Sequence, residues 1–163
     1  GYTREWYLDR IAAIRRIMPD AGISADLITG FCGETEEQDQ DTLSLMEEVQ
    51  YEFAYMFSYS ERPKTLAERK YEDDIPADVK GRRLTEIVDM QRKHSEIRTK
   101  QGVGKVHRVL VENISKKSAD MMSGRNSQNT VVVFPKGNLK KGDYVNVMVT
   151  SCTSGTLIGE VRD

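Results

Sequence analysis

The residues best suited to chemistry lie in a glycine-punctuated turn between residues 30 and 35. An apolar run ends at Gly30, and Gly-Phe-Cys-Gly-Glu-Thr then leads directly into a charged segment that begins a helix. Glycines let the backbone approach a ligand closely, and free N–H groups at a helix start favour polar or anionic atoms. The turn is therefore a candidate ligand site. An ordinary capped βα turn without a ligand is the alternative.

A second candidate segment is Tyr59-Ser60-Glu61-Arg62-Pro63-Lys64-Thr65, which follows the next apolar run. Arg62 can bind a phosphate or carboxylate through two parallel N–H groups, and Tyr59 can stack on a ring. Both segments follow expected strands, so we place them at the carboxyl edge of a parallel sheet, where such folds bind ligands. Asp26 lies within the first of these strands, where a carboxylate is costly unless paired. It either faces the interior of a barrel or has a structural partner.

Two polar segments near the carboxyl terminus suggest contacts with nucleic acid. They are Ser115-Lys116-Lys117-Ser118 and Gly124-Arg125-Asn126-Ser127-Gln128-Asn129, both expected to be exposed loops. Cationic and amide side chains of this kind contact phosphates and base edges. Solvated turns without a ligand are the alternative.

The sequence predicts neither a catalytic residue nor a metal ligand. Cys32 and Cys152 are far apart, and two thiols make no metal motif. We interpret Cys32 as a small loop residue, because no histidine is near it in sequence to activate a thiol. His94 and His107 belong to no triad and are interpreted as surface or packing residues.

The elements that would position these residues begin with a helix capped by Thr3 and ended by Pro19. A buried strand over residues 23–30, a helix from Thr35 to about Gln50 with a Thr35/Gln38 capping box, and a strand over 53–59 follow. This alternation is typical of a parallel βα sheet. Residues 61–74 read as a polar loop.

A long helix is then predicted from Pro76 to about Lys100, and Gly102 and Gly104 end it. Its inward residues are expected to be Val79, Leu84, Ile87 and Val88. From Lys105 the period changes to two, and further β-rich runs cover residues 129–134, 144–150 and 156–161. Short strands separated by turns indicate a small antiparallel β-barrel. We therefore expect two domains, residues 1–101 and 102–163.

The composition is that of a folded chain without a membrane span. Of the 163 residues, 31% are charged and 38% hydrophobic, and no apolar run approaches the roughly 20 residues that cross a bilayer. Two isolated cysteines fit a reducing, cytoplasmic setting. Residues 1–101 carry 15 Lys and Arg against 21 Asp and Glu, whereas residues 102–163 carry 9 against 5. The basic carboxyl-terminal part favours an RNA partner, as a weak signal.

The order and spacing of Asp26–Glu37 and Tyr59–Pro63 resemble the radical-SAM methylthiotransferases. Residues 102–163 resemble the TRAM domain, the small OB-like β-barrel that ends these enzymes, so the resemblance covers essentially the whole chain. It implies the last βα units of a partial, TIM-like radical-SAM barrel, a long connecting helix and the TRAM barrel. The turn at Gly124–Asn129 and the strand Val131-Val132-Val133-Phe134 resemble the tRNA-modifying branch.

The resemblance places Ile28, Gly30 and Glu34 beside S-adenosylmethionine, and it assigns Tyr59 and Arg62 to the substrate side. It implies RNA contacts from Lys116, Lys117, Arg125, Asn126, Gln128 and Asn129. The family has glycine at position 64 and a large aromatic or histidine at position 39. Lys64 and Asp39 depart from this pattern, so we expect an altered loop and looser packing of the second helix.

The family holds two 4Fe-4S clusters on six cysteines, and this sequence has two. We therefore expect a carboxyl-terminal fragment, inactive by itself, of an enzyme that adds a methylthio group to isopentenyl-adenosine beside the tRNA anticodon. Its expected partner is the anticodon stem-loop, and an incomplete barrel is expected to self-associate through its open edges. A relative acting on ribosomal protein or on threonylcarbamoyl-adenosine, and a non-enzymatic RNA-binding module, remain alternatives.

Overall fold

The computed structural model describes residues 1–162, which divide into two compact units. One unit comprises residues 23–94, and the other comprises residues 1–22 together with residues 95–162. Among the described residues no helix is both long and apolar enough to cross a membrane. The expected boundary near residue 101 stays a prediction.

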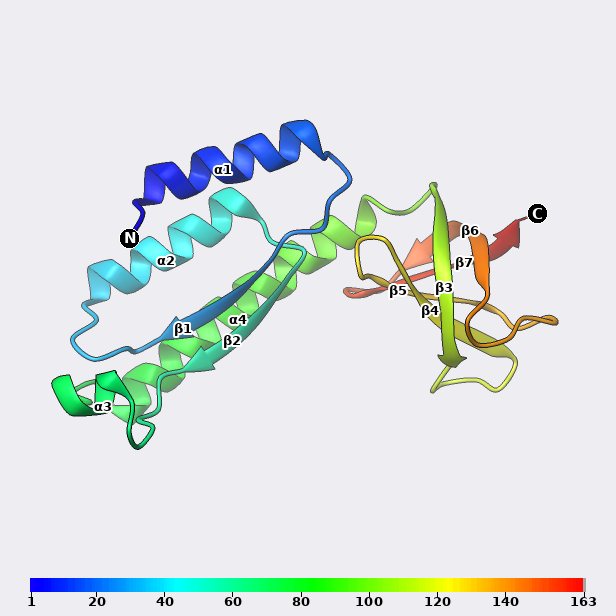
Figure 1. Ribbon diagram of the computed structural model, residues 1–163. Helices are drawn as coiled ribbons and strands as arrows, with labels where there is room; N and C mark the ends of the chain where they lie inside the picture. The colour runs from blue at the N-terminus through cyan, green and yellow to red at the C-terminus, as the bar shows by residue number, and fades with distance from the viewer. Residues whose placement is uncertain (163) are drawn as a thin grey trace. The chain divides into compact units, whose positions relative to one another are not determined.

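The unit of residues 23–94 is built on two parallel strands, β1 (Ser24–Thr29) and β2 (Phe53–Ser58), as the sequence predicts (Figure 1). Helix α2 (Glu36–Val49) connects them. Thr35 and Gln38 form the predicted capping box, in which the Thr35 Oγ1 accepts from the Gln38 N–H and the Gln38 Oε1 accepts from the Thr35 N–H. These contacts satisfy two otherwise unpaired groups at the helix start.

A short helix, α3 (Leu66–Lys70), interrupts the segment predicted to be a loop. Its first N–H groups are capped by Thr65, whose Oγ1 accepts from the Glu68 N–H at 3.2 Å. A helix of little more than one turn is too short to show a hydrophobic period, so sequence periodicity could not reveal it.

Helix α4 (Ala77–Lys100) has the predicted length, but most of its buried residues are polar. Of the four residues expected to face inward, only Ile87 is fully buried. The buried stripe consists of Lys80, Arg83, Ile87, Gln91 and His94. His94 and Gln91 pack with partners in the same unit: the His94 Nε2 lies 3.0 Å from the Glu47 Oε2, and the Gln91 Nε2 donates to the Tyr51 carbonyl at 2.9 Å. Their hydrogen bonds offset the cost of burying polar groups.

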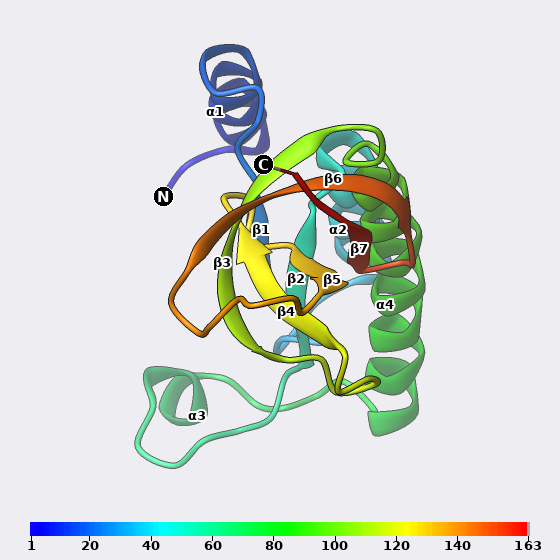
Figure 2. The same ribbon diagram turned by 90° about the vertical axis from the view of Figure 1, so that its right-hand side faces the viewer.

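In the other unit, helix α1 (Arg4–Ile17) begins at the predicted cap, where the Thr3 Oγ1 accepts from the Trp6 N–H. Five strands follow α4 and close into a barrel in the order β3-β4-β5-β7-β6, curving around a common centre in Figure 2. They are β3 (Val106–Ile114), β4 (Met121–Asn126), β5 (Val131–Pro135), β6 (Tyr144–Cys152) and β7 (Thr156–Arg162).

The barrel corrects the prediction of an all-antiparallel sheet, because β5 and β7 pair in parallel. Five strands cannot close with every neighbour antiparallel, since an odd number of direction reversals does not return to the start. The interior is apolar and alternates with outward residues along each strand. Its buried members are Val109, Val111, Met122, Val132, Phe134, Val145, Val147, Val149 and Leu157.

Strand β4 was not predicted, and it shortens the expected loop at Gly124–Asn129. Gly124, Arg125 and Asn126 lie in the strand, and only the following residues form the turn. Serine, glycine and asparagine have low strand propensity, which hid this element. Gly124 is nevertheless required, because a Cβ there would collide with the Leu110 carbonyl oxygen on β3.

Candidate cofactor loop and nucleic-acid interface

Hydrogen bonds between its own residues hold the turn after β1. The Glu34 Oε2 accepts from the Gly30 N–H at 2.5 Å, and the Glu34 N–H donates to the Phe31 carbonyl at 2.9 Å. Gly30 has a φ of +71°, and a Cβ there would lie 2.5 Å from the Lys80 Cγ. Glycine is therefore needed both for the backbone conformation and for the space.

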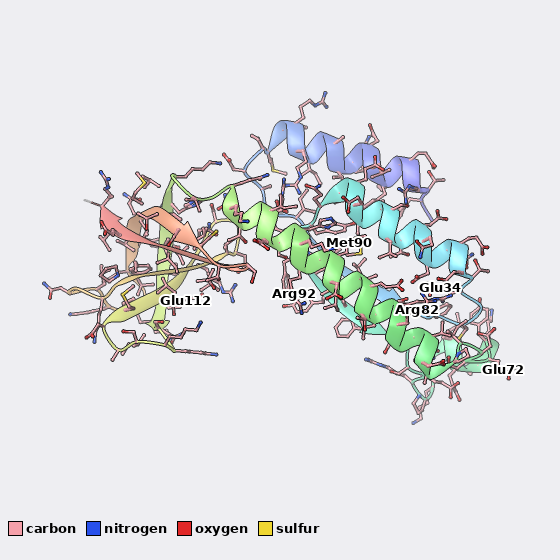
Figure 3. All side chains as sticks on the ribbon, turned by 180° about the vertical axis from the view of Figure 1, so that it is seen from behind. Glu34, Glu72, Arg82, Met90, Arg92 and Glu112 are labelled. Carbon is pink, nitrogen blue, oxygen red and sulfur yellow. The ribbon has the colours of Figure 1, made fainter. Side chains whose placement is uncertain are left out.

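Arg83 of α4 joins this turn to the start of α2. Its side chain is only 4% exposed, and its Nη1 donates to the Glu34 Oε2 at 2.9 Å and to the Glu34 carbonyl at 3.2 Å. Its Nη2 donates to the Glu36 Oε2 at 3.2 Å. Figure 3 labels Glu34 and Arg82, the residue before Arg83, where α4 passes the start of α2. The Glu34 carboxylate thus shapes the loop through charge-assisted hydrogen bonds.

Asp39 lies fully buried beside the same guanidinium. Its Oδ1 accepts from the Thr29 Oγ1 at 3.0 Å, and its Oδ2 lies 3.9 Å from the Arg83 Nε. Neither the Asp39 Oδ2 nor the Arg83 Nε has a hydrogen bond among the described residues. Burial raises the pKa of the Asp39 carboxyl, while the Thr29 hydrogen bond and the Arg83 charge oppose that shift.

The second predicted segment meets the first at the carboxyl ends of the strands. The Tyr59 N–H donates to the Thr29 carbonyl at 2.8 Å, and the Tyr59 ring packs edge-on against Phe31 at 5.0 Å. Burial and the neighbouring Cys32 thiol raise the pKa of Tyr59, so its hydroxyl stays protonated at neutral pH. Arg62 is exposed. Lys64 adopts a φ of +69°, the conformation that glycine would take without strain.

Two aspartates just before α4 contact the turn after β1 and the first part of α4. The Asp74 Oδ1 accepts from the Gly33 N–H at 2.7 Å, and Asp73 pairs with the Lys80 ammonium group. The Lys80 Nζ also lies 5.3 Å from the centre of the Tyr59 ring. The turn, the Tyr59 segment and the start of α4 therefore form one connected polar network.

One face of the two-stranded sheet is exposed and strongly aromatic. Strand pairing places Asp26 beside Tyr55 and Ile28 beside Phe57, and the Phe53 and Tyr55 rings contact each other at 4.6 Å. Ile28 is 57% exposed on this face. Asp26 is exposed on the same face, which favours the first of its two sequence interpretations. An apolar face of this kind normally has a covering partner.

The barrel places the predicted RNA-contacting residues in two turns. Lys116 and Lys117 are exposed in the turn between β3 and β4. The Arg125 Nη1 donates to the Asn129 carbonyl at 2.7 Å and to its Oδ1 at 3.2 Å, which holds the guanidinium at the second turn. Asn129 takes a φ of +63°, and the Gln128 Nε2 donates to the Asp20 carbonyl at 2.8 Å.

Asn126 is buried and is used inside that turn. Its Oδ1 accepts from the Gln128 N–H at 3.1 Å and from the Thr130 N–H at 2.9 Å. Its Nδ2 lies 3.2 Å from the His107 Nδ1, and the His107 Nε2 lies 3.0 Å from the Gly102 carbonyl. His107 is thus a packing residue, and Asn126 positions the turn that carries Gln128 and Asn129.

The described residues do not fit an iron–sulfur cluster. Cys32 and Cys152 are free thiols in different units, and no group of three or more Cys, His, Asp or Glu side chains among residues 1–162 could hold a metal ion. A 4Fe-4S cluster needs several thiolates together.

Comparison with known proteins identifies the barrel. Residues 100–161 match the TRAM domain family. The barrel is similar to a TRAM domain. The predicted resemblance to methylthiotransferases is also confirmed, because the chain matches the carboxyl-terminal third of proteins named as such enzymes.

These relatives are named tRNA-2-methylthio-N(6)-dimethylallyladenosine synthase. The protein of Amoebophilus asiaticus is 61% identical over 161 residues, and that of Flavobacterium johnsoniae is 60% identical over 159 residues. The Bacteroides thetaiotaomicron protein is 54% identical over 159 residues. Each alignment covers 98% of this chain but only 33–35% of the relative, so the chain spans about a third of their length.

Replacing Arg83 by methionine is expected to destabilise the chain far more than the same change at Arg82. Arg83→Met leaves the half-buried Glu34 and the buried Asp39 carboxylates without their cation, which costs about 3–5 kcal/mol. The Arg82 side chain is 45% exposed, and its ion pairs with Glu36 and Glu86 contribute little because solvent screens them. Urea unfolding of both variants measures the difference, and equal losses would contradict the burial argument.

Asp39→Asn is expected to change how stability depends on pH. Because the folded-state pKa of Asp39 is raised, the folded protein takes up a proton at a higher pH than the unfolded chain does. The wild type should therefore gain stability over Asp39→Asn as pH falls from neutral toward 3.8, the ordinary value for aspartate. Unfolding free energies across this range measure the gain, with the exposed Asp41→Asn as the control. A relative loss would mean that Arg83 favours the ionised form more than burial opposes it.

Proposed function

We propose that this chain is the carboxyl-terminal third of a tRNA methylthiotransferase that modifies isopentenyl-adenosine beside the anticodon. The observation that carries the proposal is identity of 61% extending over both units rather than over the TRAM domain alone. In this proposal the chain supplies part of a cofactor pocket and the RNA-docking barrel. By itself it is inactive, because its two cysteines cannot hold the clusters.

The pair β1–β2 is proposed to be the end of a larger radical-SAM barrel completed by the rest of the longer protein. Its exposed face carries Ile28, Tyr55 and Phe57, which suit an enclosed interior better than water. The carboxyl ends of its strands carry the loops at Gly30 and Tyr59, where βα barrels place their active sites.

S-adenosylmethionine is proposed to bind beside the turn after β1. Ile28 offers an apolar contact to the adenosine part, and Gly30 lets the backbone come close to it. Glu34 acts mainly by holding Gly30, since its carboxylate already accepts from the Gly30 N–H and from Arg83. When bound, this cofactor supplies the radical chemistry of the family, and the cysteines for the clusters lie outside this chain. Tyr59 and Arg62 would face the substrate.

The TRAM domain is proposed to bind the anticodon stem-loop through its two turns. Lys116, Lys117 and Arg125 supply positive charge for phosphates, and Gln128 and Asn129 supply amides. Asn126 holds the turn that carries Gln128 and Asn129 by accepting hydrogen bonds from two of its N–H groups.

The test is binding of an anticodon stem-loop RNA across a salt series. Changing Lys116, Lys117 and Arg125 together to alanine should weaken binding and flatten the salt dependence, because each lost phosphate contact lowers the slope by about 0.7–0.9. The control changes Lys70, Arg92 and Lys93 to alanine, which removes the same charge from exposed sites in the other unit. No binding by the wild type at low salt would contradict RNA docking and favour the ribosomal-protein alternative.

The isolated chain is expected to self-associate through the exposed face of β1 and β2. Light scattering should give a mass above the 18.6 kDa of one chain, rising with concentration. Tyr55→Lys should lower that mass by placing a charge in the apolar face, whereas Tyr2→Lys, at another exposed tyrosine, should not. A monodisperse monomer at all concentrations would refute the expectation.

A further inference from the structure

The outer surface of the barrel carries an exposed aromatic ring that no interior packing requires. Tyr144 begins β6 and is 61% exposed, whereas its neighbour Val145 points into the core. The Arg108 guanidinium lies 4.3 Å from the centre of the Tyr144 ring. This cation–π contact steadies the ring, and most of its surface remains open to solvent.

Strand pairing gathers further cationic and amide groups around Tyr144. Leu110 of β3 pairs with Tyr144 on one side and with Arg125 of β4 on the other. Two residues further along β3 and β6, Arg108 pairs with Asn146 of β6. Asn146 in turn pairs with Arg162 of β7. All of these residues except Leu110 are exposed, and the strand neighbours of Arg108, Tyr144 and Asn146 fill the core. We call this set the arginine–tyrosine face: Arg108, Arg125, Tyr144, Asn146 and Arg162.

Among residues 1–162, the acidic groups nearby do not cancel this charge. Glu112 lies 3.7 Å from the Arg125 Nε and offsets that one arginine in part. Glu160 pairs with Met148, one row beyond Asn146. The Asp143 carboxylate accepts from the Lys140 N–H at 2.8 Å and so is engaged in its own turn. Arg108 and Arg162 therefore leave the face positive around the Tyr144 ring.

We infer that the arginine–tyrosine face binds an unpaired RNA nucleotide whose base stacks on Tyr144, with Arg108, Arg125 and Arg162 contacting the flanking phosphates. The inference rests on the proposed RNA-docking role and extends it from Arg125 at the second turn onto the outer face of β3, β6 and β7. An exposed ring among arginines suits single strands, because an unpaired base offers a free π-face and its backbone offers charge. A continuous duplex offers phosphates but no free base face. Asn146 can donate to and accept from a base edge.

The experiment compares a short single-stranded oligoribonucleotide containing 2-aminopurine with the same strand annealed to its complement. Binding to the whole chain is followed by anisotropy, and stacking by quenching of the 2-aminopurine fluorescence. Tyr144→Ala should weaken single-strand binding about tenfold and remove the quenching, because base–aromatic stacking is worth about 1–3 kcal/mol. Tyr144→Phe should keep both, since the ring and not the hydroxyl makes the contact.

Matched variants separate stacking from folding and from charge. Tyr144→Leu keeps a large apolar side chain on β6 and should lose quenching as Tyr144→Ala does. Tyr2→Ala removes an exposed tyrosine elsewhere and should change nothing. Arg108→Ala should weaken binding and lower the salt slope by about 1, whereas Arg92→Ala should not.

Three results would overturn the inference. Equal affinity for the duplex, or unchanged quenching in Tyr144→Ala and Tyr144→Leu, would show that no base stacks on this ring. If changing Lys116 and Lys117 together to alanine then still weakened binding, the proposed RNA docking would stand and only the arginine–tyrosine face would fall. Absence of RNA binding by the wild type would overturn both.

Discussion

The buried guanidinium of Arg83 is the contact on which the rest of the candidate cofactor site depends. It neutralises the Glu34 carboxylate and faces that of Asp39, and both groups would be costly to bury alone. Glu34 in turn holds the Gly30 N–H, and Asp39 holds the Thr29 hydroxyl at the end of β1. A single cation therefore fixes the end of the strand, the turn and the helix start relative to one another.

The two candidate sites owe their order to different forces. At the cofactor loop, geometry comes from charged groups that satisfy one another inside the protein, so removal of one member leaves others unpaired. In the barrel, geometry comes from an apolar interior, and the outward residues are free to vary without loss of core packing. The identities of Arg108 and Tyr144 can therefore follow the needs of a ligand, whereas those of Arg83 and Glu34 are constrained by the folded structure.

Much of the fold followed from local patterns. The parallel pair, the capping box at Thr35 and the long helix to Lys100 were predictable because period and cap residues are local signals. Strand β4 and the short helix α3 were not, since one has low strand propensity and the other spans little more than a turn. Pairing with β3 and β5 overrode local preference in β4.

The sequence predicted where the candidate site lies but not which residues contact one another there. The glycine turn and the Tyr59 segment pointed to the carboxyl edge of the sheet, where they do meet. Arg83 was missed because a charged residue on a polar helix reads as solvent-exposed, and its partners lie 47 and 49 residues away. The one available signal was Asp39, an acid at a helix position where the resemblance implies a bulky side chain. Tyr144 and Arg108 were missed because strand register, unknown from sequence, brings them together.

The position of Gly30 also limits how this turn can evolve. Two independent requirements act there, a backbone conformation with φ of +71° and the lack of room beside Lys80. Asparagine tolerates the first but not the second, and a smaller residue at position 80 relieves only the second. Replacement of Gly30 therefore requires a change at position 80 as well, and then favours asparagine, which accepts the backbone conformation. A lineage that replaced this glycine would have to change α4 first, so the turn is a barrier to gradual drift.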